Sequence, residues 1–524
     1  MQTAVEARPD ASRATSNIDV LITASEAYPK FEALMLGATN NIVMGFRIFD
    51  PETRLVSEKA RAVGSIWADL LVHTLNRGVP VTLMLSDFDP IVGHTLHEMA
   101  WRSVEALEAL NDRTKPDAAQ ITVNCFQHPA EGGFASRLIF ALKTRKKLRE
   151  IAREITESDH PEERLHYAPG LSDLLFIKGG KVRMRKTALP APRPVTLHHK
   201  MAIFDDEITY IGGLDLNDRR YDDLEHDRGA QETWHDVQMV SHDPQVAMAA
   251  QEYLRTLPDV THRKAPPARH ASPLRVTLSR KRASNFWHLA PERVLTQLLD
   301  EYLKQIARAR TFIYIETQYF RDRRISKALA RAAQRNAGLR LIVLLPAAPE
   351  EALIDESPGI DTKFGEYLQA RALRRVRRAF GNRFLAVSPI QPRRPDARDA
   401  SHDRATLEGS PVVYVHSKLA IFDDHAAIIS SANINGRSMK WDAEAGVVLD
   451  TPEEVRFLTS RVFEIWLGED KDCTPQTAFT CWVNRALRNA GRAPEDREGF
   501  IVPYDLKAAT LAGVPVPGAP EELV

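Results

Sequence analysis

Apolar and polar positions follow the same order of strand, helix and strand in both halves of this chain. In the first half, an apolar run at 41–49 precedes a helical pattern at about 57–77 and a second apolar run at 79–85. The same order returns at 311–315, 325–336 and 339–345. Parallel strands need a crossover of this kind, and the crossover is right-handed. The pattern therefore predicts two β-α-β units, one in each half.

Further helical periodicity frames both units. We expect helices at 24–36 and about 292–309 before the first strands, and helices rich in Arg and Lys at 135–156 and 371–383 in the insertions that follow. The simpler interpretation of the two basic helices is a solvated face on an amphipathic element. The alternative is a rim that attracts anionic headgroups.

Within this repeated framework, one short pattern of polar residues occurs twice. Each copy is a His-x-Lys-x4-Asp sequence on an apolar strand, followed by a turn of small residues. The copies are His198, Lys200 and Asp205 in the first half, and His416, Lys418 and Asp423 in the second. One match arises by chance on the order of a tenth of a time per chain, and a lone histidine of this kind is more often a core residue. Two matches on equivalent strands indicate one composite site.

The residue types of the two copies suit phosphoryl transfer. Period-2 geometry places the His and the Lys of each copy on one face of the strand. Ammonium groups neutralise phosphate oxygens and stabilise a trigonal-bipyramidal transition state. One imidazole can attack phosphorus in line while the other protonates the leaving oxygen. No metal-ligand spacing accompanies either motif, so we expect chemistry without a metal or a cofactor.

The duplication also defines the expected fold. It is an α/β protein made of two repeats, with two mixed or mostly parallel β-sheets flanked by helices and the active site at the pseudo-twofold interface. The expected segments are a disordered polar lead at 1–17, a first half at 18–257, a linker at 258–273, a second half at 274–470 and a C-terminal tail at 471–524.

These features resemble the phospholipase D superfamily, whose signature is a pair of His-x-Lys-x4-Asp motifs on a duplicated α/β fold. The resemblance covers nearly all of 18–470. It extends to blocks that are similar to those of true phospholipases D, at 212–216, 220–222, 234–237, 314–320 and 431–439. Three departures are Ser430, where the family usually has Gly, Thr317, where it has Asn, and Asp215, which stands in the first half where the second half has Asn433.

The resemblance implies a ping-pong mechanism through a phosphohistidine. By family pattern, His198 is the nucleophile and His416 the general acid and base, an order that the pseudo-symmetry of the halves leaves open. Lys200 and Lys418 would hold the phosphoryl oxygens.

The resemblance also implies a set of supporting residues. Asn433 and Ser431 would donate hydrogen bonds to the phosphate, and Asp215 occupies the place of Asn433 in the first half. The carboxylates that orient the imidazoles fall at Asp236 and Glu444. As members of the motif, Asp205 and Asp423 are grouped with the catalytic residues, although we interpret them as structural residues that hold the turn after each strand.

The implied activity is that of a phospholipase D. It would hydrolyse a glycerophospholipid, with phosphatidylcholine as the expected substrate, to phosphatidate and a free alcohol, and a small alcohol could replace water as the acceptor. The alternatives are a phosphatidyl transferase of the cardiolipin synthase type, a nucleic-acid phosphodiesterase, and a duplicated module that binds phosphate without catalysis.

Composition bears on the partners. Lys+Arg and Asp+Glu balance at 70 each in 524 residues, and aromatic and basic residues do not interleave, which argues against nucleic acid. We expect a monomer that works peripherally at a phospholipid membrane surface. Neither a secretory leader nor a membrane-spanning run is visible, so we expect a soluble protein, cytoplasmic or peripheral to a membrane. Export by a route without a classical leader is the alternative.

Overall fold

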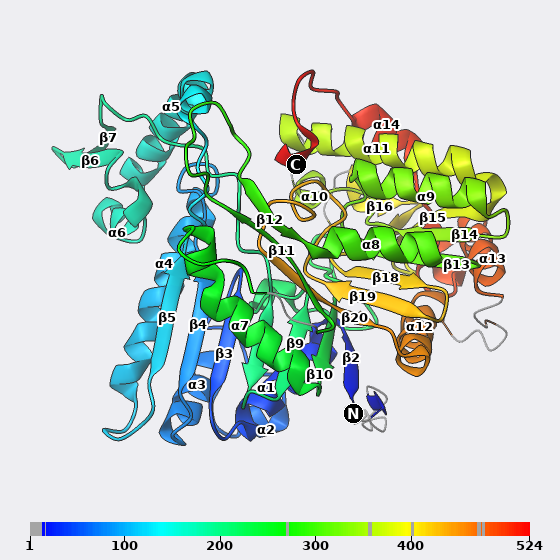
Figure 1. The fold of residues 1–524 in the computed structure, drawn as a ribbon, viewed down its shortest axis with the longest axis horizontal. Helices are drawn as coiled ribbons and strands as arrows, with labels where there is room; N and C mark the ends of the chain where they lie inside the picture. Colours follow the sequence, from blue (N-terminus) through cyan, green and yellow to red (C-terminus); the bar gives the residue numbers. More distant parts are fainter. Residues whose placement is uncertain are drawn as a thin grey trace.

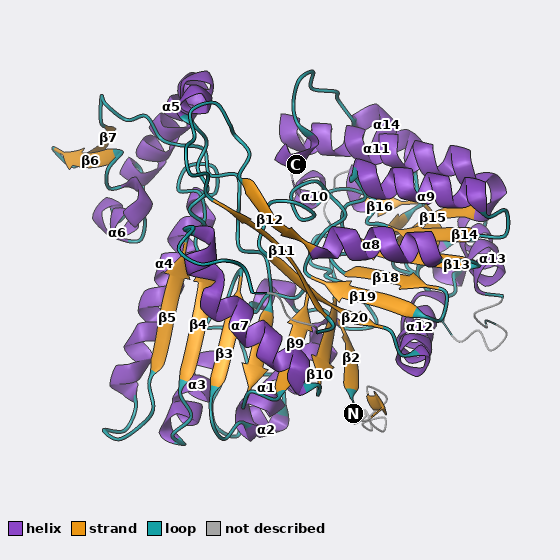
Figure 2. Cartoon of the chain, in the orientation of Figure 1, coloured by secondary structure: helices purple, strands orange, loops and turns teal. Residues whose placement is uncertain are grey.

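Two large β-sheets with helices on their faces make up the chain (Figure 1, Figure 2). The computed structural model describes residues 13–15, 17–268, 272–354, 359–399, 403–468, 473 and 477–524. Most of the predicted lead, part of the predicted linker and the start of the predicted tail lie outside the described residues. The predicted α/β class with two sheets flanked by helices is confirmed.

The first half builds a sheet of eight strands. They are β1 (Arg13–Thr15), β2 (Ile18–Ile22), β3 (Ile42–Phe46), β4 (Val81–Ser86), β5 (Ile121–Phe126), β8 (Met201–Phe204), β9 (Ile208–Gly212) and β10 (Val237–Ser241). The helices are α1 (Thr23–Gly37), α2 (Glu58–Arg61), α3 (Trp67–Asn76), α4 (His94–Glu108), α5 (Phe134–Thr156), α6 (Pro161–His166) and α7 (Pro244–Thr261). Helices α1, α3 and α4 pack on one face of the sheet, and α7 packs on the other.

The second half builds a sheet of nine strands. They are β11 (Leu274–Arg280), β12 (Glu292–Thr296), β13 (Phe312–Thr317), β14 (Arg340–Leu344), β15 (Phe384–Pro389), β18 (Lys418–Phe422), β19 (Ala426–Ser430), β20 (Glu444–Leu449) and β21 (Ile501–Pro503). The helices are α8 (Gln297–Arg308), α9 (Arg323–Arg335), α10 (Glu350–Ile354), α11 (Ile360–Phe380), α12 (Pro452–Leu467), α13 (Ala478–Ala490) and α14 (Leu506–Ala512). Two small hairpins, β6 (Leu175–Lys178) with β7 (Lys181–Met184) and β16 (Thr406–Leu407) with β17 (Ser410–Pro411), lie outside the main sheets.

Both sheets are mixed. The strand orders are β1-β2-β10-β9-β8-β3-β4-β5 and β12-β11-β20-β19-β18-β13-β14-β15-β21. Strands β3, β4 and β5 are parallel, as are β13, β14 and β15, which agrees with the predicted β-α-β units. The other neighbouring strands are antiparallel, so the sheets are mixed as expected, and the alternative that they are mostly parallel was wrong. The reason is that short turns join β8 to β9 and β18 to β19, and a short turn can only connect antiparallel strands.

The helix expected at about 57–77 is divided into α2 and α3, and the helix expected at 371–383 is the last part of α11. Three further segments differ because of tertiary partners. The helix expected at 292–309 starts at Gln297, because 292–296 pair with β11 as strand β12. The expected linker begins inside α7, which continues through Pro258 to Thr261. The expected tail contains β21, which extends the second sheet beside β15, and α14, which packs against α11. Each of these three differences comes from a tertiary partner that local periodicity does not reveal.

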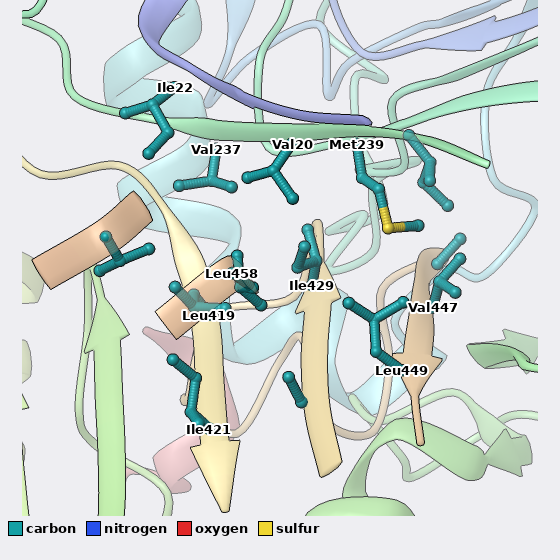
Figure 3. Close-up of a cluster of buried hydrophobic side chains, with 14 of the residues drawn as sticks. Val20, Ile22, Val237, Met239, Leu419, Ile421, Ile429, Val447, Leu449 and Leu458 are labelled. Carbon is teal, nitrogen blue, oxygen red and sulfur yellow. The ribbon is translucent and has the colours of Figure 1, made fainter. Parts of the chain in front are cut away.

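The inner faces of the two sheets share one hydrophobic core (Figure 3). Strands β2 and β10 of the first half face β18, β19, β20 and helix α12 of the second. The labelled side chains are Val20, Ile22, Val237 and Met239 on one side and Leu419, Ile421, Ile429, Val447, Leu449 and Leu458 on the other. Close packing of this core fixes the halves, and with them the two motifs, relative to each other. Among the described helices, none has both the length and the apolar character that crossing a membrane requires.

Candidate active site

The two histidine motifs meet because their backbones cross from one half into the other. Before β8, Leu197 forms a parallel bridge with Ala443, and the His198 N–H donates to the Ala443 carbonyl oxygen at 2.8 Å. Before β18, the His416 N–H donates to the His235 carbonyl oxygen at 2.7 Å. Each histidine is therefore anchored beside a residue of the opposite half that directly precedes a carboxylate.

Each imidazole pairs with that carboxylate. His416 Nδ1 lies 2.6 Å from Asp236 Oδ2, and His198 Nδ1 lies 3.1 Å from Glu444 Oε2. His198 Nδ1 also lies 3.1 Å from the Ser431 carbonyl oxygen. An acceptor at Nδ1 keeps the hydrogen there and leaves the Nε2 lone pair for the reaction. The geometry fits the orienting role expected for Asp236 and Glu444.

The motif lysines are buried beside the histidines. Lys200 Nζ donates to the His198 carbonyl oxygen at 2.6 Å, and Lys418 Nζ donates to the His416 carbonyl oxygen. Lys200 Nζ also lies 3.8 Å from Asp215 Oδ2, so Asp215 supplies a counter-charge. An ammonium group has three N–H donors, and each lysine therefore keeps donors for phosphate oxygens.

Burial shifts the pKa values of these groups toward their neutral forms. It lowers the pKa of both imidazoles well below 6.5, and the neighbouring lysine charges lower them further. It raises the pKa of Asp236 to about 6 and that of Glu444 to about 7, and it lowers the pKa of Lys418 to about 7. A phosphodiester entering the site adds a negative charge, which favours charged lysines and a protonated imidazole. Anion binding would therefore charge the groups that the reaction needs.

Ser431 and Asn433 differ in how well they suit the phosphate-donor role that we expected. The Ser431 hydroxyl donates to Glu444 Oε2 and accepts from the Ala445 N–H at 3.1 Å. It is therefore engaged in positioning Glu444, and the expectation that it donates to phosphate is corrected. Asn433 Nδ2 donates to Gln318 Oε1 at 3.0 Å, which leaves it one further N–H.

Asp205 and Asp423 lie at the opposite ends of β8 and β18 from the histidines. Asp205 accepts backbone N–H bonds from residues 39–41 at 2.7 to 3.2 Å. Asp423 accepts the equivalent bonds from residues 310–312 at 2.7 to 2.9 Å. The seven residue steps from His198 to Asp205 span about 23 Å when extended. These carboxylates hold the turns, as interpreted from the sequence, and grouping them with the catalytic residues is not supported by their position.

The two halves make room for their carboxylates in different ways. A Cβ on Gly213 would lie 2.2 Å from Asp236 Oδ1, so the close approach of this carboxylate requires glycine. The equivalent position in the second half is Ser431, whose hydroxyl bonds to Glu444 instead. The departure at Ser430 is accommodated by Gly446 on the neighbouring strand, where a Cβ would lie 2.4 Å from the Ser430 Cβ.

Arg47 lies near His198 although no predicted motif or block marked it, whereas Arg220 and Trp234 fall in the blocks at 220–222 and 234–237. Arg47 directly follows β3, and its charge contributes to the low pKa of His198. The Trp234 ring packs against His416 with centroids 4.5 Å apart, and the Arg220 guanidinium carbon lies 3.6 Å from the centroid of the Trp234 ring. The sequence could have indicated Arg47 by its position immediately after an apolar strand, at the edge of the sheet that holds the first histidine motif.

A second buried polar network lies behind the second motif. Glu316 accepts hydrogen bonds from the Tyr314 hydroxyl at 2.6 Å, from Trp466 Nε1 at 2.9 Å and from the Ser417 hydroxyl. His235 Nε2 lies 3.1 Å from the same carboxylate. Because His235 belongs to the first half, this network fastens the segment that carries the second motif to the opposite half.

Comparison with known proteins extends these observations. Residues 302–466 match the family described as "Cardiolipin synthase, PLD-like domain". Phospholipase D zeta 1 of Arabidopsis thaliana is 28% identical over 204 residues, which cover 33% of this chain and 18% of the relative. Human phospholipase D1 is 31% identical over 243 residues, which cover 36% of this chain and 21% of the relative. The matched stretches thus span about a fifth of these relatives. The solved phosphatidylserine synthase of Haemophilus influenzae aligns over 90% of this chain and 93% of its own, with a TM-score of 0.49 and 13% identity.

Proposed function

Because the chain belongs to the phospholipase D superfamily, we propose that it is a phosphodiesterase of the phospholipase D type that acts on glycerophospholipids. The observation that carries this proposal is the crossed pairing of two buried imidazoles with carboxylates of the opposite halves, at 2.6 and 3.1 Å. Two oriented imidazoles beside two ammonium groups match the needs of a double-displacement phosphoryl transfer. Phosphatidylcholine is the proposed substrate.

In the first step, His198 Nε2 attacks the phosphorus and a P–N bond forms. The P–O bond to the headgroup breaks, and the leaving oxygen takes the proton of His416 Nε2. The buried carboxylate of Asp236 stabilises the protonated His416 before this transfer. Lys200 and Lys418 hold the two non-bridging oxygens throughout.

In the second step, His416 accepts a proton from water or from a primary alcohol as its oxygen attacks phosphorus. The P–N bond breaks and His198 is regenerated. Water yields phosphatidate, and an alcohol yields a new phosphatidyl ester. The same site thus supports hydrolysis and transphosphatidylation, and the acceptor decides between them.

A second candidate is a phosphatidyl transferase of the cardiolipin synthase type. The name of the family that matches residues 302–466 favours it. This enzyme would use the hydroxyl of a second phosphatidylglycerol as its acceptor, with the same histidines and lysines. It differs from the first candidate in the headgroup that leaves the donor lipid and in the acceptor that reaches the phosphohistidine.

The test is to incubate the protein with phosphatidylcholine vesicles, with and without ethanol and without added metal. We expect free choline and phosphatidate, and phosphatidylethanol when ethanol is present. Formation of cardiolipin and glycerol from phosphatidylglycerol, with little choline release, would favour the transferase. Cleavage of DNA without turnover of any phospholipid would overturn the proposal.

Two variants test the roles of the histidines. His198→Ala and His416→Ala should each abolish turnover of phosphatidylcholine while the thermal unfolding curve stays close to that of the wild type. A phosphodiester with a nitrophenol leaving group needs no proton donor, so His416→Ala should release nitrophenol once and accumulate the phosphoryl group, still carrying its second ester, on His198. Mass spectrometry that finds the phosphate on another residue would reverse or refute the assigned order.

A further inference from the structure

Six large apolar side chains lie exposed together at one end of the molecule. They come from the N-terminal part of α5 and from the loop at 281–291 between β11 and β12, which Figure 1 shows beside each other. We call this group the apolar tip. Its members and their exposed fractions are Phe134 (45%), Leu138 (54%), Ile139 (76%), Leu142 (86%), Phe286 (51%) and Trp287 (74%). Large apolar side chains that gather on a surface mark an interaction site.

The two segments of the tip are joined by specific contacts. The Gly133 N–H donates to the His288 carbonyl oxygen at 2.8 Å, and the Ala135 N–H donates to the Phe286 carbonyl oxygen at 2.9 Å. The rings of Phe134 and Phe286 pack with their centroids 5.6 Å apart. The tip is therefore one surface with contributions from both halves of the chain.

Basic residues accompany both segments of the tip, and three of them, Arg137, Arg275 and Arg280, are paired with Glu131, Glu301 and Glu292. From 134 to 149 the chain has no Asp or Glu, and from 274 to 291 it again has none. The basic residues in these stretches are Arg137, Lys143, Arg145, Lys146, Lys147, Arg149, Arg275, Arg280, Lys281 and Arg282. Apolar side chains with an exposed tryptophan, beside basic residues, match the interfacial region of a bilayer and its anionic headgroups.

The tip also stands close to the segments that carry the active site. Helix α5 follows β5, and the carboxyl ends of β5 and β3 lie at the same edge of the sheet. At this edge the end of β3 pairs with the start of β8. At the base of the tip, Ala130 and Ala290 pack with Val195 and Trp441 in one buried cluster. Val195 is three residues before His198, and Trp441 is three residues before Glu444.

We propose that the apolar tip inserts into the surface of an anionic phospholipid bilayer and holds the active site at the lipid. This inference rests on the proposed phospholipid substrate and names the surface that meets it. The first half of α5 is then explained. Its apolar stripe at 134, 138 and 142 faces away from the protein, whereas Leu148, Ile151 and Ile155 further along the helix are buried against β6 and β7.

The direct test is binding to vesicles of phosphatidylcholine mixed with phosphatidylglycerol, measured by co-sedimentation. The structure describes all seven tryptophans of the chain, and Trp287 is the only exposed one among them. Brominated lipid should therefore quench the fluorescence of Trp287 selectively. The double variant Phe286→Ser/Trp287→Ser should lower the partition coefficient at least about tenfold. Leu511→Ser is the matched control, because Leu511 is 76% exposed but lies on α14. Lys143→Glu/Lys146→Glu should weaken binding at low salt and have little effect at high salt.

A soluble phosphodiester, bis(p-nitrophenyl) phosphate, separates this inference from the proposed function. We expect the double variant to keep wild-type turnover of the soluble substrate and to lose turnover of vesicles. If the wild type hydrolyses neither substrate yet binds vesicles through the tip, the proposed function fails and the docking surface stands. Unchanged vesicle binding by the double variant would overturn the inference. The inference would also be overturned if the wild type were a dimer, the double variant a monomer, and vesicle binding the same for both, since the tip would then be a contact between two copies.

Discussion

Replacing Asp236 by Asn and Glu444 by Gln removes one negative charge from each half of the site and preserves the side-chain shapes. The two carboxylates are pseudo-equivalent, yet their surroundings differ. Asp236 Oδ1 accepts the Val237 N–H at 2.9 Å while Oδ2 faces His416 at 2.6 Å. The two substitutions should therefore have very different effects on the reaction.

In Asp236→Asn, the amide oxygen stays on the Val237 N–H, because only an acceptor satisfies that donor. The amide NH2 group then faces His416 Nδ1 and forces its hydrogen to Nε2, where the histidine can no longer act as a base. A wrong tautomer of this kind costs about 10⁴-fold in kcat, or about 5.4 kcal/mol. We expect a loss of this size.

In Glu444→Gln, no such conflict arises. The amide oxygen can face His198 Nδ1, which also keeps the Ser431 carbonyl oxygen at 3.1 Å. The tautomer is preserved, and only the stabilisation by the negative charge is lost. At metal sites, removing the carboxylate that supports a histidine costs about 10- to 100-fold, and we expect a loss of the same order here.

The assay is kcat on bis(p-nitrophenyl) phosphate, with thermal unfolding to confirm that both variants fold. The expected ratio of kcat between Glu444→Gln and Asp236→Asn is at least about 100-fold, the difference between the two losses. Equal losses in two folded variants, or a larger loss in Glu444→Gln, would refute the tautomer argument.

Three further predictions concern pH, packing and the turns. kcat/KM should rise with pH as Glu444, whose pKa is about 7, ionises, and should fall as Lys418, whose pKa is lowered to about 7, loses its charge. The measurement is a pH profile of the wild type and of Glu444→Gln, and the acid limb of the variant should lie at lower pH than that of the wild type. Gly213→Ala should lower kcat at least about tenfold, because its Cβ would lie 2.2 Å from Asp236 Oδ1 and displace it. Asp205→Asn should lower the free energy of unfolding by about 1–2 kcal/mol in a denaturant titration and leave kcat unchanged.

Each of these three predictions has a control or a result that would contradict it. Gly37→Ala is the matched control for Gly213→Ala, because no atom lies within 4 Å of the Cβ it would gain. A flat pH profile between 5 and 9 would contradict the pKa argument. A large loss of kcat in a stable Asp205→Asn variant would return that carboxylate to the catalytic machinery.

Local pattern in the sequence determined much of the architecture. Alternation and helical periodicity marked the two parallel β-α-β units, and the repeated His-x-Lys-x4-Asp motif marked the strands β8 and β18, which the two histidines directly precede. These features depend on neighbouring residues in the chain, so a single sequence contains them. The resemblance to the superfamily then supplied Asp236 and Glu444 as orienting carboxylates.

Only the tertiary structure decided how these parts combine. The contacts that pair His198 with Glu444 and His416 with Asp236 join residues 246 and 180 positions apart, which no local period encodes. The structure also showed that the Ser431 hydroxyl is hydrogen-bonded to Glu444 and therefore does not serve the phosphate. The apolar tip depends on the meeting of α5 with a loop about 150 residues further along the chain. Sequence thus specified the chemistry of each strand end, and packing between the halves specified which groups face each other.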